Sequence, residues 1–290
     1  MASVNGDSVT HSLSERDDMP VVSPWCNSQL KRICDFLGAL VLLILLLPVM
    51  ALLALVMKLI SRGPVLFRQR RPGRNGHEFF ICKFRTMVVN GDQEGPVLTR
   101  ADDPRVTGFG RYMRRWKLDE LPQLFNVIRG EMSFVGPRPQ PTKLWREPAI
   151  QKQASVVLSV RPGITSYATL AFRYEEELLA PLSALEIEGV YLRKLMPLKL
   201  KMEIDYLREA RFFSDLVIIF KTAGRIFKRQ KHVDEKSRLL AEDKKLPRAA
   251  EQPDSQRQGS HARSWQLVPE FDNIVPVSKK NPSAEETAET

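Results

Sequence analysis

The most constraining feature of this chain of 290 residues is an uninterrupted apolar run near its start. Residues 36–57 contain neither a charge nor a hydrogen-bonding side chain over 22 positions. As a helix, the run would be about 33 Å long, close to the thickness of the hydrocarbon core of a bilayer. It begins too far into the chain, and is too long, for an ordinary secretory signal, and no second run of this kind follows. The sequence therefore predicts one membrane-embedded helix.

Pro48 lies in the middle of this run, where it removes a backbone hydrogen bond and predicts a kink. A kinked helix can cross the bilayer, or it can turn back and leave by the face that it entered. The run alone favours a spanning helix, the commoner structure, but basic flanks on both sides are typical of cytoplasmic segments and keep re-entry open. These flanking residues are Lys31 and Arg32 before the run, and Lys58, Arg62, Arg68, Arg70 and Arg71 after it.

The rest of the chain divides by composition. Residues 1–28 are polar and predict a flexible lead-in, residues 29–62 carry the membrane helix, and residues 63–230 form the folded domain. Residues 231–290 contain 10 Lys or Arg and 11 Asp or Glu with few aromatic residues, which predicts a disordered tail. The three cysteines cannot all pair and lack metal-ligand spacing, so a reducing compartment is expected.

Positive charge is concentrated directly after the apolar run. Residues 58–129 contain 15 Lys or Arg against 7 Asp or Glu, a net charge of +8 within a chain total of +10. Such a belt attracts anionic lipid headgroups and anionic substrates. Nucleic acid is the rival partner, but the belt has neither regularly interleaved aromatic residues nor a recognised binding module. We therefore expect a membrane surface and anionic substrates as partners, and no nucleic acid.

Short periodic patterns predict a mixed α/β fold that is mostly helical and contains a β-hairpin. The predicted elements are strands over 65–69 and 79–84, joined by an Asn75-Gly76 turn, and helices over 109–116 and 121–128. The helix over 109–116 is basic and amphipathic, which suits a membrane surface. A last apolar stripe fits the domain core and a membrane surface equally well, and consists of Leu216, Ile219, Phe220, Ala223 and Phe227.

The best candidate for chemistry is the carboxylate pair Asp119-Glu120, which lies inside the basic belt and is followed by Leu121-Pro122. The Walker loop, the G-x-S-x-G elbow and the H-E-x-x-H metal motif do not occur in the sequence. The plain interpretation of the pair is a helix start with Asp119 as the N-cap. The alternative is phosphoryl transfer, because an ionised carboxylate can attack phosphorus without a general base and its neighbour can hold Mg²⁺.

Two cations occur in contexts that suit phosphate binding. Arg138 lies between Pro137 and Pro139, which stiffen the backbone that presents its guanidinium. Lys83 lies on the predicted return strand of the hairpin. Each also has an ordinary interpretation, as an exposed arginine in a proline turn and as a solvated strand edge.

Taken in order, these motifs resemble those of the bacterial sugar transferases, the monotopic polyprenyl-phosphate phosphoglycosyl transferases. The resemblance covers residues 29–228, and although each motif alone is weak, the ordered set is specific. The matching segments are 31–36, the apolar run with Pro48, 63–67, 69–73, 83–87, 103–107, 118–126, 130–133, 136–139 and 161–165.

The resemblance implies that a UDP-sugar donates its phosphosugar to a polyprenyl phosphate such as undecaprenyl phosphate, with UMP as the leaving group. It implies a compact catalytic domain on the cytoplasmic face of the bacterial inner membrane, and a re-entrant helix broken at Pro48. A homo-oligomer is left open. The implied site consists of Asp119 as the nucleophile that carries the phosphosugar, Glu120 as the ligand of Mg²⁺, and Arg138, Lys83 and Arg114 as phosphate contacts.

The sequence departs from the family pattern at two places. Leu47 precedes Pro48 where the family often has serine, and residues 166–177 replace a segment that bears on sugar choice, so no sugar is assigned. The lack of a multi-span N-terminal domain indicates the small, single-function form. Two rival functions remain open, namely a membrane-anchored adaptor that binds anionic lipid and an ordinary glycosyl transferase that releases UDP.

Overall fold

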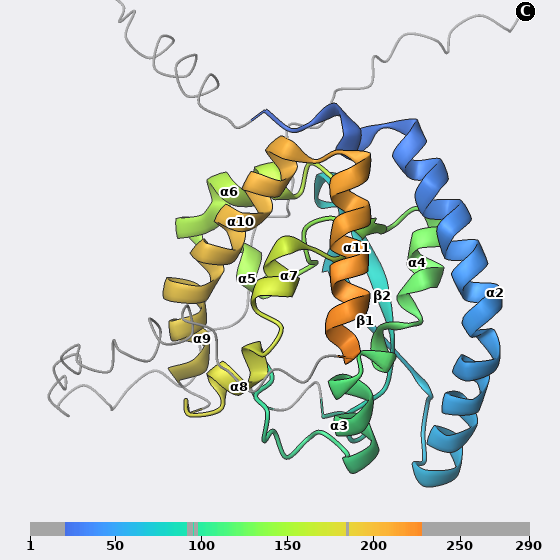
Figure 1. Ribbon diagram of the computed structural model, residues 1–290. Coiled ribbons are helices and arrows are strands. Elements are labelled where there is room, and N and C mark those ends of the chain that lie inside the picture. Colours follow the sequence, from blue (N-terminus) through green and yellow to red (C-terminus); the bar gives the residue numbers. More distant parts are fainter. Residues whose placement is uncertain (1–20, 92–94, 96–97, 184–185, 228–290) are drawn as a thin grey trace, which may run out of the picture. The chain divides into compact units, whose positions relative to one another are not determined.

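The computed structural model describes residues 21–91, 95, 98–183 and 186–227 (Figure 1). A long N-terminal helix, α2 (Gln29–Ile60), precedes a β-hairpin and a series of shorter helices that ends with α11 (Phe212–Phe227). The described residues are mostly helical, as the sequence predicts, and they form two small sheets. The other elements are η1 (Pro24–Asn27), β1 (Leu66–Pro72), η2 (Arg74–Gly76), β2 (Glu78–Phe84), α3 (Gly108–Arg115), η3 (Leu118–Glu120), α4 (Gln123–Arg129), β3 (Ser133–Val135), α5 (Thr142–Trp145), η4 (Pro148–Ile150), α6 (Gln151–Val157), β4 (Gly163–Thr165), α7 (Tyr167–Ala171), α8 (Glu175–Leu179), α9 (Glu186–Val190), η5 (Tyr191–Leu195) and α10 (Met196–Glu209).

The predicted hairpin is confirmed and is longer than expected. Strands β1 and β2 pair antiparallel from Leu66 opposite Phe84 to Pro72 opposite Glu78. Asn75 has φ 57° and Gly76 has φ 77°, the left-handed backbone that asparagine and glycine adopt most readily. One face of β2 is buried against α4, so the hairpin is held between solvent and the core.

A second sheet, which the sequence patterns do not predict, pairs β3 and β4 in parallel. A Cβ atom on Gly163 would lie 2.2 Å from the backbone nitrogen of Gly136, so glycine is required where the two chain segments approach each other. Strand β3 contacts both α2 and α11. It therefore connects the N-terminal helix to the end of the domain.

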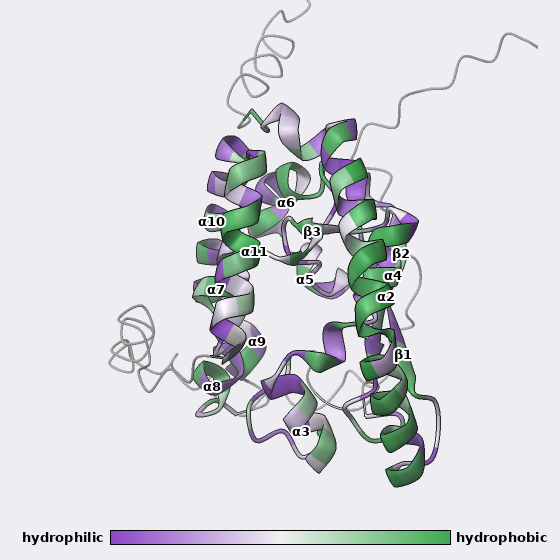
Figure 2. Cartoon of the chain, turned by 45° about the vertical axis from the view of Figure 1, so that its right-hand side comes forward, coloured by the Kyte–Doolittle hydropathy of each residue, from purple (hydrophilic) through white to green (hydrophobic). Residues whose placement is uncertain are grey.

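Helix α2 packs along one face against the rest of the domain and leaves its other sides exposed. Its N-terminus is capped by the Ser28 hydroxyl, and it continues as one helix through Pro48. The break that the resemblance implies at Pro48 is therefore not confirmed. Ala39 packs against β2 and α4, while Met50 and Met57 pack near Phe84. Figure 2 shows α2 as a nearly continuous hydrophobic ribbon.

The main core lies around Trp145 and Tyr191, between α5, α6, η5 and α10. Helix α11 covers this core with Ile218, which is fully buried. The opposite side of α11 exposes Phe213 and Phe220, at 77% and 71% of their surface. Helix α11 therefore has both a side that packs in the core and an exposed apolar side, as the two interpretations of the stripe expected. The buried side is centred on Ile218, which is not one of the predicted residues of the stripe.

The segment directly before α2 is ordered against the end of the chain's folded part. The Trp25 indole N–H and Lys31 Nζ both donate to Asp215 Oδ2, at 2.9 and 2.5 Å, and Tyr206 OH donates to Oδ1 at 2.8 Å. Residues 21–28, the end of the predicted flexible lead-in, therefore belong to the packed domain. Residues 1–20 and the predicted tail over 231–290 lie outside the described residues.

Candidate active site

The carboxylate pair lies in a tight turn between two helices. Lys117 has a left-handed backbone, with φ 55° and ψ 22°, and lies between the end of α3 and the start of the turn η3. Helix α4 begins only at Gln123, and Pro122 occupies its N-cap position without a side-chain capping bond. Asp119 is therefore not the N-cap that the plain interpretation expects. Both carboxylates are instead buried, with Asp119 6% and Glu120 9% exposed.

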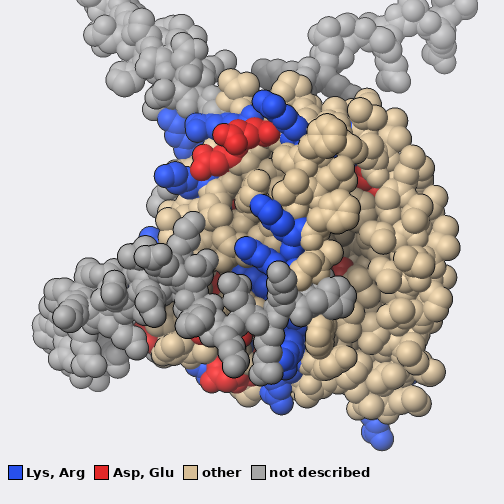
Figure 3. All heavy atoms as spheres, viewed as in Figure 1, with Lys and Arg blue, Asp and Glu red and all other residues tan. Residues whose placement is uncertain are grey.

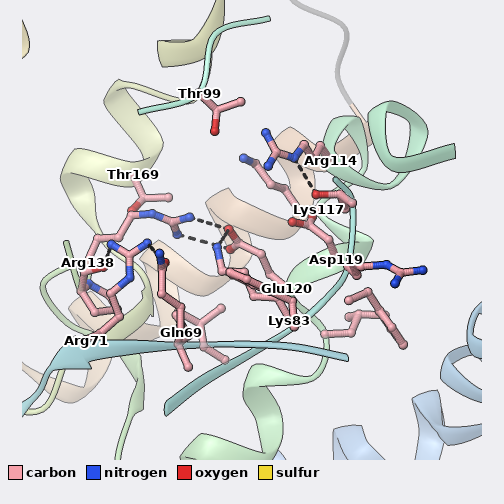
Figure 4. A pocket seen from close by; sticks show the side chains of 18 of the residues that line it. Gln69, Arg71, Lys83, Thr99, Arg114, Lys117, Asp119, Glu120, Arg138 and Thr169 are labelled. Atoms are coloured by element: carbon pink, nitrogen blue, oxygen red, sulfur yellow. Dashed lines mark hydrogen bonds and ion pairs between the residues drawn. The ribbon is translucent and has the colours of Figure 1, made fainter. Parts of the chain in front are cut away.

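Glu120 is held by two cations that come from distant parts of the chain (Figure 4). Arg138 binds it in a two-pronged ion pair, with Nη1 3.3 Å from Oε2 and Nη2 closer still to Oε1. Lys83 Nζ, from β2, lies 3.3 Å from Oε1. Burial would raise the pKa of Glu120, but the charges of Arg138 and Lys83 together hold that pKa well below the ordinary range. Glu120 is therefore ionised.

Asp119 has a different environment from its neighbour. Burial and the negative charge of Glu120 raise the pKa of Asp119, although the positive charges of Lys83 and Lys117 oppose the shift. Its Oδ1 atom is buried and has no hydrogen-bond partner among the described residues. A buried carboxylate oxygen without a partner is energetically costly, so this oxygen is available to a group that binds in the cavity.

Both carboxylates line a cavity of about 710 Å³, a volume typical of small-molecule sites. The β-hairpin forms one wall of this cavity, and strand alternation and cross-strand pairing determine which of its side chains face the cavity. Phe67 pairs with Lys83, and Gln69 and Arg71 follow at two-residue spacing on the same face of β1. Figure 4 shows Gln69 and Arg71 beside Arg138 and Lys83.

Arg71 is a site residue that the sequence argument did not single out. It donates to Gln69 Oε1 at 2.5 Å and to the Pro139 carbonyl at 3.4 Å, and its buried Nε has no partner among the described residues. Burial lowers the pKa of Arg71 to about 9, and the neighbouring charge of Arg138 adds to the shift. Such a guanidinium favours an anion beside it. The sequence could have indicated Arg71 as a site residue. If the predicted strand is extended beyond residue 69, its two-residue period places Arg71 on the same face as Gln69.

The sequence of the chain matches a known protein family. The family model described as bacterial sugar transferase matches residues 26–229. The chain belongs to the bacterial sugar transferase family. It is 38% identical over 205 residues to an undecaprenyl-phosphate glucose phosphotransferase of Komagataeibacter xylinus, covering 69% of this chain and 36% of the relative.

Other relatives of this bacterial sugar transferase have similar names. A UDP-glucose:undecaprenyl-phosphate glucose-1-phosphate transferase of Escherichia coli (strain K12) is 35% identical over 229 residues, which is 76% of this chain and 46% of the relative. The Caulobacter vibrioides protein of the same name is 38% identical over 194 residues, 66% of this chain and 67% of the relative. The chain thus spans less than half of the length of the first two relatives, and about two thirds of the third.

The structure brings together most of the site residues that the sequence predicts. Asp119, Glu120, Lys83 and Arg138 converge, whereas Arg114 lies on the cavity wall and makes different contacts. Its Nε donates to Thr86 Oγ1 at 2.8 Å, and its Nη1 lies 3.2 Å from Glu176 Oε1. Arg114 therefore contacts neither carboxylate of the pair in this structure.

The site residues suit a divalent cation that is bound partly by substrate phosphate. They suit a cation held by protein side chains alone less well. Among the described residues, no group of three or more His, Cys, Asp or Glu side chains is arranged to hold a metal. Glu120 and Asp119 both line the cavity, and Oδ1 of Asp119 has no hydrogen-bond partner among the described residues. Mg²⁺ is commonly bound by one or two carboxylates together with substrate phosphate and water, and this donor set matches that pattern.

Proposed function

We propose that this bacterial sugar transferase is a phosphoglycosyl transferase. It moves a phosphosugar from a UDP-sugar to a polyprenyl phosphate, releases UMP and forms a polyprenyl diphosphate sugar. The observation that carries the proposal is Asp119, a buried carboxylate whose Oδ1 has no hydrogen-bond partner among the described residues, beside a Glu120 that two cations keep ionised. The names of the relatives support the donor and acceptor classes.

The residues suggest a reaction in two steps. The ionised Asp119 carboxylate attacks the phosphorus that carries the sugar, the bond to the UMP oxygen breaks, and UMP leaves with that electron pair. An oxygen of the acceptor phosphate then attacks the same phosphorus, which releases the Asp119 carboxylate and completes the new diphosphate. Arg138, Lys83 and Arg71 neutralise phosphate charge in both steps.

A bound Mg²⁺ would neutralise further phosphate charge, with Glu120 as its protein ligand. Glu120 is already paired with Arg138 and Lys83, so its negative charge is shared between the two cations before any substrate enters. When a diphosphate occupies the cavity, it offers these cations a new anionic partner. Arg138 and Lys83 thus balance the charge of Glu120 and can also bind the phosphates of the substrate.

We also propose that α2, which is one continuous helix in this structure, bends at Pro48 in the membrane and leaves by the face that it entered, so that the domain lies on the cytoplasmic face of the inner membrane. The support is that α2 packs on the domain from Ala39 in its first half to Met57 near its end. A helix that crossed the bilayer alone would lose these contacts over half its length. The basic residues on both flanks agree with one cytoplasmic side, where anionic headgroups attract them. Labelling a tag at residue 2 from the periplasm tests this, because re-entry predicts protection and a spanning helix predicts labelling.

The activity is tested by nucleotide release. The purified chain in detergent, with Mg²⁺ and undecaprenyl phosphate, is offered a panel of UDP-sugars, and the products are separated by chromatography. UMP formation with one sugar would support the proposal and identify the donor. UDP formation would indicate an ordinary glycosyl transferase. No nucleotide release by the folded chain would favour the membrane-anchored adaptor.

A further inference from the structure

Glu203 of α10 is a buried carboxylate that the proposed reaction does not use. Charged side chains ordinarily lie at the surface, as those coloured in Figure 3 do, because water stabilises their charge. Glu203 is only 4% exposed. Burial raises its pKa to about 7, although its hydrogen bonds and the charges of Lys199 and Arg138 oppose the shift. A buried carboxylate is costly, so the contacts of Glu203 show what it contributes.

One oxygen of Glu203 joins two segments that lie at the active site. Its Oε1 atom accepts a hydrogen bond from the Ser166 hydroxyl at 2.7 Å and another from the backbone N–H of Arg138 at 3.4 Å. Ser166 is the N-cap of α7, where its Oγ atom also accepts the backbone N–H of Thr169 at 3.0 Å. The Oε2 atom of Glu203 is buried and has no hydrogen-bond partner among the described residues. Glu203 thus binds the main chain at Arg138 rather than its guanidinium.

The same face of α10 holds two further segments of the chain. Lys199 lies one turn before Glu203, and its Nζ donates to Glu175 Oε2 at 2.5 Å. Tyr206 lies about one turn after Glu203, and its hydroxyl is 3.3 Å from the Val135 carbonyl oxygen. Positions 199, 203 and 206 share one face of a helix, and all three side chains are buried. This buried polar face of α10 therefore fixes several loops, and Glu203 is the member that reaches a phosphate-binding residue.

The main-chain bonds between the Arg138 turn and β4 end before Arg138. The Gly136 N–H donates to the Thr165 carbonyl at 3.1 Å, and the Pro137 carbonyl accepts the Gly163 N–H at 2.9 Å. The next residue, Pro139, has no N–H to donate. Glu203 therefore supplies the hydrogen bond that holds the main chain at Arg138 itself.

We propose that Glu203 is a positioning residue for Arg138, which sets where the guanidinium meets Glu120 and the substrate phosphate. The inference rests on the proposed function and adds a residue that acts on its phosphate site from outside the cavity lining. The reach of the acceptor oxygen matters in this role, and the negative charge does not. A shift of about 1 Å in the main chain at Arg138 is enough to slow the chemistry about 100-fold.

Three substitutions at position 203 separate reach from charge. Glu203→Gln keeps an acceptor oxygen at the same distance and removes the charge, whereas Glu203→Asp keeps the charge and withdraws it by one methylene group. Glu203→Leu removes both. Tyr206→Phe, which loses a buried hydroxyl on the same face of α10 but no bond to Arg138, is the matched control.

Two measurements are made on each variant in detergent with Mg²⁺. The first is the exchange of labelled UMP into the UDP-sugar without acceptor, at a temperature where the variant is folded. The second is hydrogen–deuterium exchange of the peptide that contains the Arg138 amide, which needs no turnover. The first measurement is repeated with each substitution in an Arg138→Ala background.

We expect Glu203→Asp and Glu203→Leu to slow UMP exchange by about 10- to 100-fold and to speed deuteration of the Arg138 amide. Glu203→Gln and Tyr206→Phe should stay within about 3-fold of the native rate. In the Arg138→Ala background, Glu203→Asp and Glu203→Leu should slow UMP exchange by less than about 3-fold, because no guanidinium remains to be positioned. If Glu203→Leu does not fold, Glu203→Asp carries the comparison.

An equal loss in both backgrounds would overturn the proposal, because it would show a general effect on the fold. A rate that follows charge, with Glu203→Gln impaired and Glu203→Asp normal, would also overturn it, as would an equal loss in Tyr206→Phe. Unchanged deuteration of the Arg138 amide in Glu203→Asp and Glu203→Leu would refute the contact itself. Absence of UMP exchange in the native chain would contradict the proposed function, and amide deuteration would then decide whether Glu203 holds the turn.

Discussion

Replacing Arg138 by alanine separates the structural and catalytic roles of the ion pair in the site. Arg138 retains 25% exposure of its side chain, whereas the side chain of Glu120 retains 10%. Removing one partner of a fully buried ion pair costs about 3–5 kcal/mol. Because Arg138 is partly exposed and Lys83 still pairs with Glu120, we expect Arg138→Ala to lower the free energy of unfolding by about 2 kcal/mol. For a domain of this size, that corresponds to a Tm about 4–8 °C lower.

The catalytic loss should be larger than this stability loss implies. Loss of one positioned donor to developing negative charge typically lowers kcat by about 100- to 1,000-fold. We expect Arg138→Ala to slow UMP exchange by this factor at a temperature where the protein is fully folded. Arg138→Lys keeps the charge but not the two-pronged geometry, so it should restore most of the Tm and only part of the rate. Arg70→Ala, at a side chain that is 70% exposed on the same hairpin, is the control and should change neither.

Thermal unfolding in detergent and isotope exchange between UMP and UDP-sugar measure the two effects on the same preparation. If Arg138→Ala exchanged UMP within about 3-fold of the native rate while folded, the assignment of Arg138 to the phosphate site would be refuted. An equal loss in the Arg70→Ala control would show that net charge, rather than position, determines the rate.

Asp119→Asn should abolish UMP exchange and yet raise Tm, as measured by thermal unfolding, because it removes a buried charge beside Glu120. Because the pKa of Asp119 is raised in the folded state, protonation of this side chain stabilises the fold. This stabilisation is complete at low pH and is lost as the pH rises through the pKa of the folded state. The rate of UMP exchange, which needs the ionised carboxylate, should rise over the same pH interval. Lys31→Met should lower the free energy of unfolding by about 2–4 kcal/mol, seen as a lower denaturation midpoint, since Asp215 would stay buried without its cation; an unchanged midpoint would count against that ion pair.

Local chemistry allowed the hairpin and part of the site to be predicted from the sequence. The Asn75-Gly76 turn fixes the hairpin because few other residue pairs adopt its backbone geometry. The sequence singles out Asp119 and Glu120 because they are adjacent carboxylates inside a basic belt, although the plain interpretation of the pair is a helix start. The prediction that these carboxylates share a site with Lys83 and Arg138 came from the family resemblance rather than from any local pattern.

Long-range packing decided the features that the sequence did not predict. Lys31 and Asp215 are 184 positions apart, and nothing near either residue indicates the other. The side of α11 that is buried depends on β3, which contacts it from a distant part of the chain. Arg114 binds Thr86 and Glu176, which lie 28 and 62 positions away along the chain. Periodicity identifies that a helix has an apolar side, but the neighbouring elements determine which residues it buries.

The central claim is that Asp119 carries the phosphosugar between donor and acceptor. The most direct test is the intact mass of the chain after brief incubation with Mg²⁺ and the UDP-sugar that supports UMP release, with no acceptor present. The account predicts a mass increase of one phosphosugar, located by peptide mapping at Asp119, absent from Asp119→Asn and removed by adding undecaprenyl phosphate. UMP release only when acceptor is present, with no adduct on the native chain at any time, would contradict it.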